Sequence, residues 1–262
     1  MFRSLSNTRT LVTTAAFSAL AFLISLIEIP SPFLPYLQLD FSEIMVILSA
    51  TTLGGGPMVL VILLRSLLRF VLKGTLVFGE VAAISASLLL GITFLLLHRT
   101  FRHRSHMVTE RHAERTLILT IVVFLGATVA LPFFPLQANW LLAAYLTFLL
   151  PALGFALILL YRRKVFAKVS PLLLIQAIVS ISVMTVGMTI LNFFFITPSN
   201  ALQTIAFYPE LVNLWFGGSL STYLYAAIAP LIPFNLFKGI LVFLVFFLIH
   251  GRIERALHQE HR

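Results

Sequence analysis

The sequence predicts an all-α, polytopic membrane protein built as a bundle of transmembrane helices. Of its 262 residues, 60% are hydrophobic and only 10% are charged, and the mean hydropathy is +1.03. Water-soluble proteins carry about 25% charged residues, so a soluble enzyme, a disordered chain and a nucleic-acid-binding domain are excluded. The apolar runs are continuous rather than alternating, which argues against a membrane β-barrel.

The basic residues predict how the chain is oriented in the membrane. The net charge is +9, and fourteen of the 18 Lys and Arg residues fall in four short polar segments, at residues 3–9, 99–115, 162–168 and 252–262. Basic segments beside membrane spans favour the cytoplasmic side. We therefore expect a multi-pass protein of the cell membrane with both termini cytoplasmic, and we read the excess charge as a topology signal, with no nucleic-acid partner.

The number of membrane crossings follows from the same rule. Seven apolar runs are obvious, but seven crossings would place the five Arg residues of the second basic segment outside the cell. The turn Gly54-Gly55-Gly56-Pro57 divides the second run, which gives eight crossings and puts every basic segment inside. The expected helices cover residues 10–29, 41–53, 57–73, 78–98, 116–135, 138–160, 171–197 and 230–250, with external loops at 30–39 and 198–229.

Several kinds of chemistry find no support in the sequence. The chain has no Cys, its seven His residues have no metal-ligand arrangement, and no phosphate-binding loop or hydrolase motif is present. We expect no metal, no cofactor and no ATPase activity of its own. The first apolar run has no cleavage site after it, so we expect a retained helix rather than a removed signal peptide.

Four cations lie within the expected spans and mark candidate functional positions: Arg65, Arg69, Lys73 and Lys238. A charge inside a membrane is costly unless it faces protein or water. The first three share one face of a helix, and Lys73 is close enough to the interface for its ammonium to reach water. The alternative interpretation of Arg65 and Arg69 is an internal ion pair with Glu80 or Glu43.

Three polar residues near the external side could form a clamp for a neutral, hydrogen-bonding ligand. Asn235 and Lys238 share a face of the last helix, and Asn192 is expected at a similar depth on the preceding helix. The alternative is hydrogen bonding between helices that only holds the bundle together. If the clamp is correct, replacing Lys238 with Ala should weaken ligand binding without unfolding the protein.

Two further patterns, one acidic and one of small residues, can be explained either by helix structure or by function. Asp40 and Glu43 have capping-box spacing, so Asp40 either caps the second helix or orients the preceding loop over a site. Ala15 and Ala19 form a small-xxx-small step, which lets another helix approach closely.

Five segments then suggest a family: residues 37–44 (LQLDFSEI), 55–57 (GGP), 79–82 (GEVA), 189–193 (TILNF) and 232–240 (IPFNLFKGI). Together they resemble the riboflavin-specific S components, of RibU type, of energy-coupling-factor vitamin transporters. The resemblance covers residues 1–101 and 171–250. It implies a six-helix core formed by helices 1–4 in residues 1–101 and the last two helices in 171–262, with residues 102–170 as an inserted basic loop and transmembrane hairpin.

The resemblance also implies a function. An S component is the high-affinity substrate-binding subunit of an ABC-type importer, so riboflavin or a related flavin is the expected ligand. The expected partners are a membrane-embedded coupling subunit and two cytoplasmic ATPases. The implied substrate contacts are Asn192, Asn235 and Lys238, with Asp40 as the loop hinge and Ala15 and Ala19 on the face that meets the coupling subunit. Apart from the resemblance, Arg65 and Glu80 are candidate substrate-binding residues because they are charged and lie within the expected spans.

Departures from the family pattern leave alternatives open. Arg65-Ser66 stands where the family usually has Lys-Asn, and Ile62 and Ala83 replace polar residues. An S component for a different vitamin or small metabolite is therefore one alternative. A stand-alone secondary transporter is another, although it would need carboxylates deep in the spans. A membrane enzyme would need a convergent His, Asp or Glu set, which we do not find.

Overall fold

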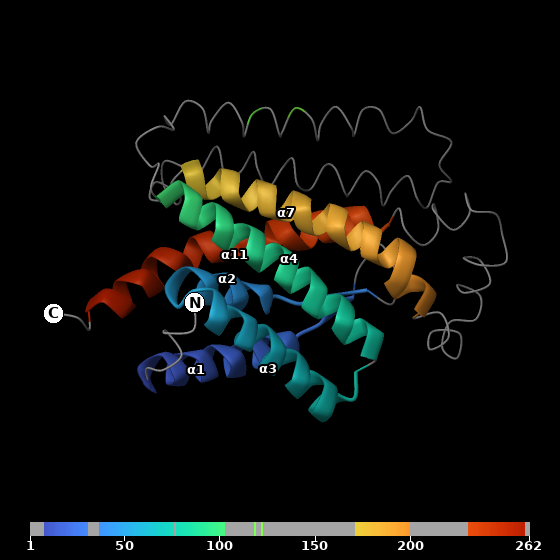
Figure 1. The fold of residues 1–262 in the computed structure, drawn as a ribbon, viewed down its shortest axis with the longest axis horizontal. Helices are drawn as coiled ribbons and strands as arrows, with labels where there is room; N and C mark the ends of the chain where they lie inside the picture. Colours follow the sequence, from blue (N-terminus) through green and yellow to red (C-terminus); the bar gives the residue numbers. More distant parts are fainter. Residues whose placement is uncertain are drawn as a thin grey trace.

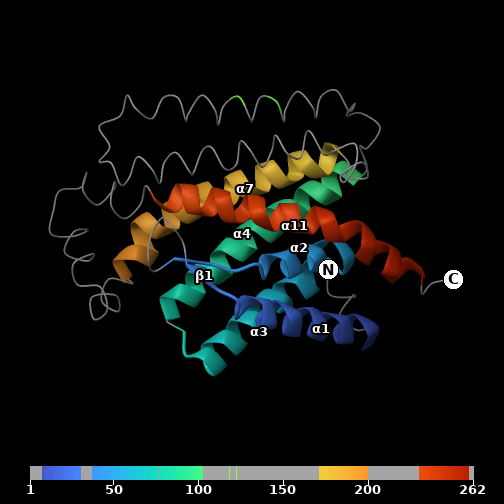
Figure 2. The ribbon, with the colours of Figure 1, turned by 180° about the vertical axis from the view of Figure 1, so that it is seen from behind.

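A computed structural model of the chain describes residues 8–30, 37–75, 77–102, 118, 122, 171–199 and 230–259. These residues form helices α1 (Thr8–Ser25), α2 (Glu43–Thr52), α3 (Gly55–Lys73), α4 (Val77–Arg102), α7 (Pro171–Leu191) and α11 (Leu231–Gln259). Helix α4 packs against α7, and α1 packs against α3 on the other side of the bundle, as Figures 1 and 2 show from two opposite views.

Five of the helices are long and apolar enough to cross a membrane: Thr8–Ser25, Gly55–Lys73, Val77–Phe101, Leu172–Ser199 and Leu231–His250. The predicted class, a polytopic bundle of membrane helices, is therefore confirmed for the described part of the chain. The expected helices at 116–135 and 138–160 lie outside the described residues, apart from two single positions. The count of eight crossings and the inserted hairpin stay predictions.

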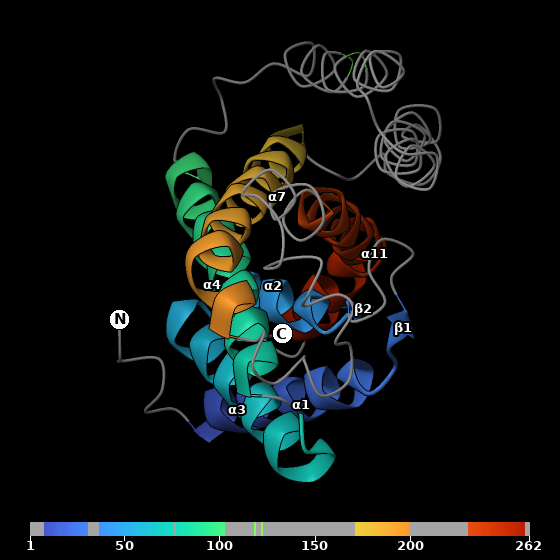
Figure 3. The same ribbon diagram turned by 90° about the vertical axis from the view of Figure 1, so that its right-hand side faces the viewer.

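Helix α2 is the centre of the bundle. It contacts α1, α3, α4 and α11, and Figure 3, which looks along the bundle, shows it enclosed by the longer helices. Its residues from Glu43 to Ala50 are all buried, as expected for a helix that is apolar on every side. Ten residues extend only about 15 Å, half of the hydrocarbon core. The helix expected over 41–53 therefore does not cross a membrane by itself.

The boundary between α2 and α3 confirms the predicted break. Gly54 adopts a φ of +95°, in the region that favours glycine, and α3 begins directly after it. Pro57 lies in the first turn of α3, where its missing N–H is not needed. Helix α3 ends at Gly74, which has a left-handed φ of +66° and donates its N–H to the carbonyl of Phe70.

The loop after α1 is flanked by a short β-ladder that the sequence did not predict. Helix α1 ends at Ser25 rather than residue 29, because the chain tightens there through bonds from the N–H groups of Leu26 and Ile27 to carbonyls three residues earlier. Strand β1 (Ile29–Pro30) then pairs antiparallel with β2 (Gln38–Leu39). Since Ile29 pairs with Leu39, the residues flanking this pair come close together at the base of the loop.

Close contacts at glycine fix how the later helices pack. A Cβ atom on Gly239 of α11 would lie 2.9 Å from the Ile181 side chain of α7, and one on Gly187 of α7 would lie 2.7 Å from Leu89 of α4. At Gly239 the neighbour is the β-branched side chain of Ile181, which has little freedom to move, whereas at Gly187 it is the flexible end of Leu89. Small residues commonly allow membrane helices to approach in this way, so the close approach of α7 and α11 depends most on Gly239.

Candidate functional site

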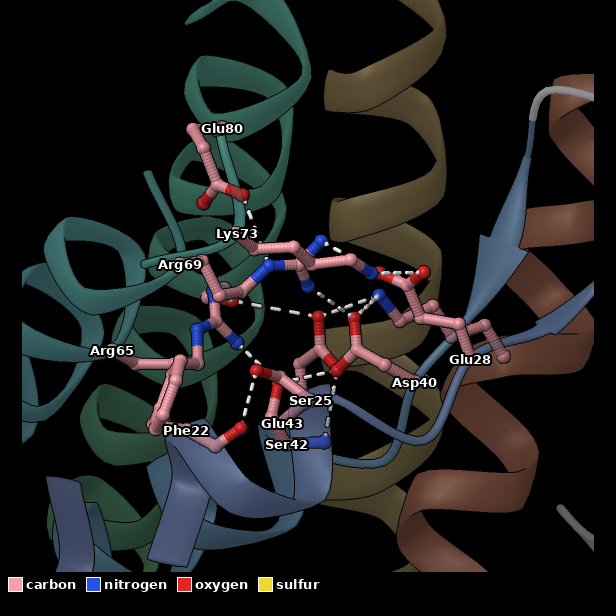
Figure 4. Close-up of polar contacts among 12 residues, drawn as sticks. Phe22, Ser25, Glu28, Asp40, Ser42, Glu43, Arg65, Arg69, Lys73 and Glu80 are labelled. Carbon is pink, nitrogen blue, oxygen red and sulfur yellow. Dashed lines mark hydrogen bonds and ion pairs between the residues drawn. The ribbon is translucent and has the colours of Figure 1, made fainter. Parts of the chain in front are cut away.

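Eight charged side chains meet at one end of the bundle, and we call them the polar cluster. It consists of Glu28, Asp40, Glu43, Arg65, Arg69, Lys73, Glu80 and Lys238. They come from the end of α1, the β2–α2 junction, α2, α3, α4 and α11, and Figure 4 shows most of them. Four carboxylates face four cations, so the formal charges within the polar cluster cancel.

Arg69 is the residue with the most ion pairs in the polar cluster. Its Nη2 lies 3.1 Å from Glu28 Oε1, its Nη1 lies 3.4 Å from Asp40 Oδ2, and its Nε lies 3.0 Å from Glu80 Oε1. Figure 4 shows these contacts around the guanidinium. The expectation that Arg69 forms an internal ion pair with Glu80 is confirmed. Because its partners lie on three segments, Arg69 joins the base of the loop after α1 to α3 and α4.

Arg65 is fully buried and is compensated through two hydroxyl groups. Its Nη1 donates to Ser42 Oγ at 2.6 Å, and its Nη2 donates to Ser87 Oγ at 3.1 Å. Ser42 Oγ in turn donates to Asp40 Oδ1, and Ser87 Oγ donates to Glu43 Oε1 at 3.5 Å. Two carboxylates were considered as partners of Arg65. Glu43 is linked to it through the Ser87 hydroxyl, whereas Glu80 forms its ion pair with Arg69.

Asp40 lies at the junction of β2 and α2 and holds the start of the helix. Its Oδ1 accepts a hydrogen bond from the Ser42 backbone N–H at 2.9 Å. Glu43, the expected partner in a capping box, is the first residue of α2, and its carboxylate contacts Lys238 instead. Burial raises the pKa of Asp40, but the Lys238 ammonium, the Arg65 guanidinium and the Ser42 hydrogen bonds outweigh it and hold this pKa well below its usual range.

Lys238 attaches α11 to the same junction. Its Nζ lies 2.6 Å from Glu43 Oε1 and 3.7 Å from Asp40 Oδ2. Asn235 is buried one turn earlier on α11, and next to it Phe234 packs on Leu39 of β2. The structure therefore brings Lys238 and Asp40 together. The ammonium neutralises buried carboxylates, so we expect its removal to lower stability as well as ligand affinity; whether the variant stays folded, as the sequence suggests, stays a prediction.

Asn192 lies apart from the polar cluster. Its Nδ2 donates to the Met188 carbonyl at 2.7 Å, and its Oδ1 accepts from Thr197 Oγ1 at 3.4 Å. Ile181, which meets Gly239 beside Lys238, comes eleven residues before Asn192 on the same helix. Eleven residues of helix extend about 16 Å, so the backbones of Asn192 and Lys238 do not share the depth that the sequence suggested.

The helix changes its geometry at Asn192. Residues Asn192–Ile196 form a π-helix, η3, near the end of what was expected to be one regular helix over 171–197. Single π-helical turns inside longer helices occur frequently at functional sites, since they turn side chains out of the regular pattern. The sequence gives no signal for this turn, because its residues, NFFFI, fit a regular apolar helix equally well.

Ala15 and Ala19 lie on the outer face of α1. Both are exposed, whereas Thr14, Phe17 and Ser18 point into the bundle and are buried. The outer face is therefore open to lipid or to another membrane protein. The coupling role expected for the two alanines stays a prediction.

The sequence analysis assigned no role to Glu28 or to the two serines beside Arg65. Glu28 is one of only nine acidic residues, and it lies at the end of an apolar run, where a charge needs a partner. That position was a usable signal. Ser42 and Ser87 offered none, because serine occurs at many positions of these helices and only the fold places these two beside a guanidinium.

Comparison with known proteins identifies the family. The family model of the ECF transporter, substrate-specific component, matches residues 9–162, more than half of the chain. The chain belongs to the S components of ECF transporters. This S component is similar to the riboflavin transporter RibU of Staphylococcus aureus (strain TCH60), with 28% identity over 141 residues, which are 52% of this chain and 72% of the relative.

The chain also shares its fold with a solved structure. A solved structure of the S component of a bacterial ECF transporter superposes with a TM-score of 0.51 at 23% identity, over 95% of this chain and 97% of the other. Membership makes this chain the substrate-specific membrane component of a transporter rather than an enzyme. It is a multi-pass protein of the cell membrane.

Proposed function

We propose that this S component binds riboflavin, or a closely related flavin, outside the cell and presents it for import. The observation that carries the proposal is the similarity to the riboflavin transporter of Staphylococcus aureus. The 232–240 motif, which contains Asn235 and Lys238, supports the same ligand. Both residues are buried at the polar cluster rather than facing lipid, as expected for functional polar residues in membrane helices.

The chemistry of the site fits an uncharged ligand with many hydrogen-bonding groups. Riboflavin carries ring carbonyls, ring nitrogens and ribityl hydroxyls and has no net charge at neutral pH. Lys238 has three N–H donors, of which two face Glu43 and Asp40, so one donor remains for a ligand acceptor. The Asn235 amide can both donate and accept one turn away.

The remaining predicted contacts receive different roles in this proposal. Asn192 lies further along α7, so it suits the distant part of an elongated ligand. Arg65 and Glu80 act through their partners, since Arg65 orients Ser42 and Glu80 holds Arg69. Asp40 fixes the base of the external loop relative to the site.

The energy for import comes from other chains in this proposal. A membrane-embedded coupling subunit meets the outer face of α1 at Ala15 and Ala19, and two cytoplasmic ATPases drive the cycle. Both termini are then cytoplasmic, as the basic segments suggest.

Uptake of labelled riboflavin tests the proposal. The chain is expressed in a bacterium that lacks riboflavin transport, with and without the coupling subunit and ATPases of a bacterial ECF transporter. We expect uptake only when all components are present, and competition by excess unlabelled riboflavin. Uptake by the chain alone would indicate a stand-alone secondary transporter, and no uptake of riboflavin with all components present would indicate a different ligand.

A further inference from the structure

The four carboxylates of the polar cluster, from Glu28, Asp40, Glu43 and Glu80, match its four cations in number. The burial of the pairs differs. Lys73 and Glu28 form the outer pair, with side chains 33% and 13% exposed. Lys238 and Glu43 form the innermost pair, with side chains 9% and 1% exposed. Charge balance is therefore most strictly required at Lys238 and Glu43, where water can least screen an excess.

Glu43 is placed to neutralise Lys238. Its Oε1 lies 2.6 Å from Lys238 Nζ, and Ser87 contributes only a longer contact of 3.5 Å to the same oxygen. The second oxygen, Oε2, has no hydrogen-bond partner among the described residues. The negative charge of Glu43 is thus available to Lys238, and Asp40 adds a second, more distant carboxylate at 3.7 Å.

A neutralised ammonium recognises ligands differently from a free one. It can still donate a hydrogen bond to a carbonyl or ring nitrogen. It no longer offers net positive charge to an anion, because the adjacent carboxylates offset it. A phosphate monoester carries about −1.5 to −2 charges at pH 7, so no net positive charge would compensate the cost of removing it from water at this buried position.

We infer that Glu43 determines specificity: by neutralising Lys238 it makes this S component select uncharged riboflavin over the same flavin carrying a phosphate monoester. Glu43 is a positioning residue that acts through Lys238. The inference rests on the proposed function, because it assumes a flavin at the polar cluster.

Two flavins and two variants test the inference. Detergent-purified protein is titrated with riboflavin and with riboflavin 5′-phosphate, and quenching of flavin fluorescence gives both dissociation constants. The native protein should prefer riboflavin by at least about tenfold. Glu43→Gln leaves Lys238 without its nearest carboxylate, so the preference should shrink by about tenfold or reverse. Glu43→Asp keeps the charge, so it should keep the preference.

A second measurement needs no variant, in case Glu43→Gln does not fold. The phosphate loses its second proton with a pKa near 6. The preference of the native protein for riboflavin should therefore grow as the pH rises from 5 to 7.5.

The outcomes separate the inference from the proposed function. Equal affinity for both flavins, an unchanged preference in a folded Glu43→Gln variant, or a preference independent of pH would each overturn the role of Glu43 while leaving riboflavin binding intact. Binding of neither flavin by the native protein would overturn the proposed function, and the inference with it.

Discussion

The Lys238 ammonium of α11 lies 2.6 Å from the Glu43 carboxylate at the start of α2. The two residues are far apart in the sequence, and their pairing ties the last helix to the central one. Removing one partner of a buried ion pair leaves the other charge uncompensated, which costs about 3–5 kcal/mol.

We therefore expect Lys238→Met to lower both stability and ligand affinity. Adding Glu43→Gln to Lys238→Met removes the stranded carboxylate, so the double variant should recover most of the stability but not the affinity. Thermal unfolding in detergent and flavin titration measure the two properties separately. If Lys238→Met has the same melting temperature as the native protein, the ion pair does not stabilise the bundle.

Arg69 provides a second test, because it contacts carboxylates of three segments. Arg69→Met should destabilise the protein by about 3 kcal/mol or more, since it strands buried acids. Lys73→Met is the matched control on the same helix face. Its side chain is 33% exposed, so the loss of its charge should cost no more than about 1 kcal/mol. Similar losses in the two variants would show that Arg69 does not hold the cluster.

The lowered pKa of Asp40 predicts how the stability of the protein depends on pH. Its pKa is held below its usual range in the folded protein by Lys238, Arg65 and Ser42, and the unfolded chain has a pKa of about 3.9 at this position. The unfolded state therefore takes up the proton first as the pH falls. The stabilisation by Asp40 is fully present above about pH 5 and decreases as the pH falls through 4 and below.

Melting temperatures in detergent between pH 3 and pH 8 measure this dependence. Asp40→Asn should lower the melting temperature at pH 7 and reduce the decline below pH 4. If the melting temperature of Asp40→Asn fell below pH 4 as steeply as that of the native protein, Asp40 would not be the source of the acid sensitivity.

The outer face of α1 is expected to serve coupling rather than binding. Replacing Ala15 and Ala19 with Leu should spare riboflavin binding by the purified protein but abolish uptake with the coupling subunit and ATPases present. The matched control is Val186→Leu, on a 60% exposed position of α7, which should support normal uptake. Loss of binding in the α1 variant would show that this face supports internal packing instead.

The sequence predicted features that depend on neighbouring residues, and it missed features that depend on contacts between residues far apart in the chain. The break at Gly54 and the end of α3 at Lys73 depend on neighbouring residues, so the sequence revealed them. Helix α4 runs to Arg102, four residues beyond the expected end. The β1–β2 ladder depends on pairing across a loop, and the partners of Arg65, Arg69 and Lys238 depend on which helices the fold brings together.

The depth of Asn192 was misjudged for a related reason. Counting residues from the two helix ends assumes that α7 and α11 are level at those ends, whereas the Gly239–Ile181 contact sets their actual register. The π-helix at Asn192–Ile196 further separates the local geometry from that of a regular helix.

The most direct test of the central claim is a riboflavin titration of the purified native protein, preceded by its visible absorption spectrum. We predict flavin absorption from co-purified ligand, or quenching of riboflavin fluorescence that saturates at one riboflavin per protein after the ligand is removed. A colourless protein that leaves riboflavin fluorescence unchanged at every concentration would contradict riboflavin as the substrate.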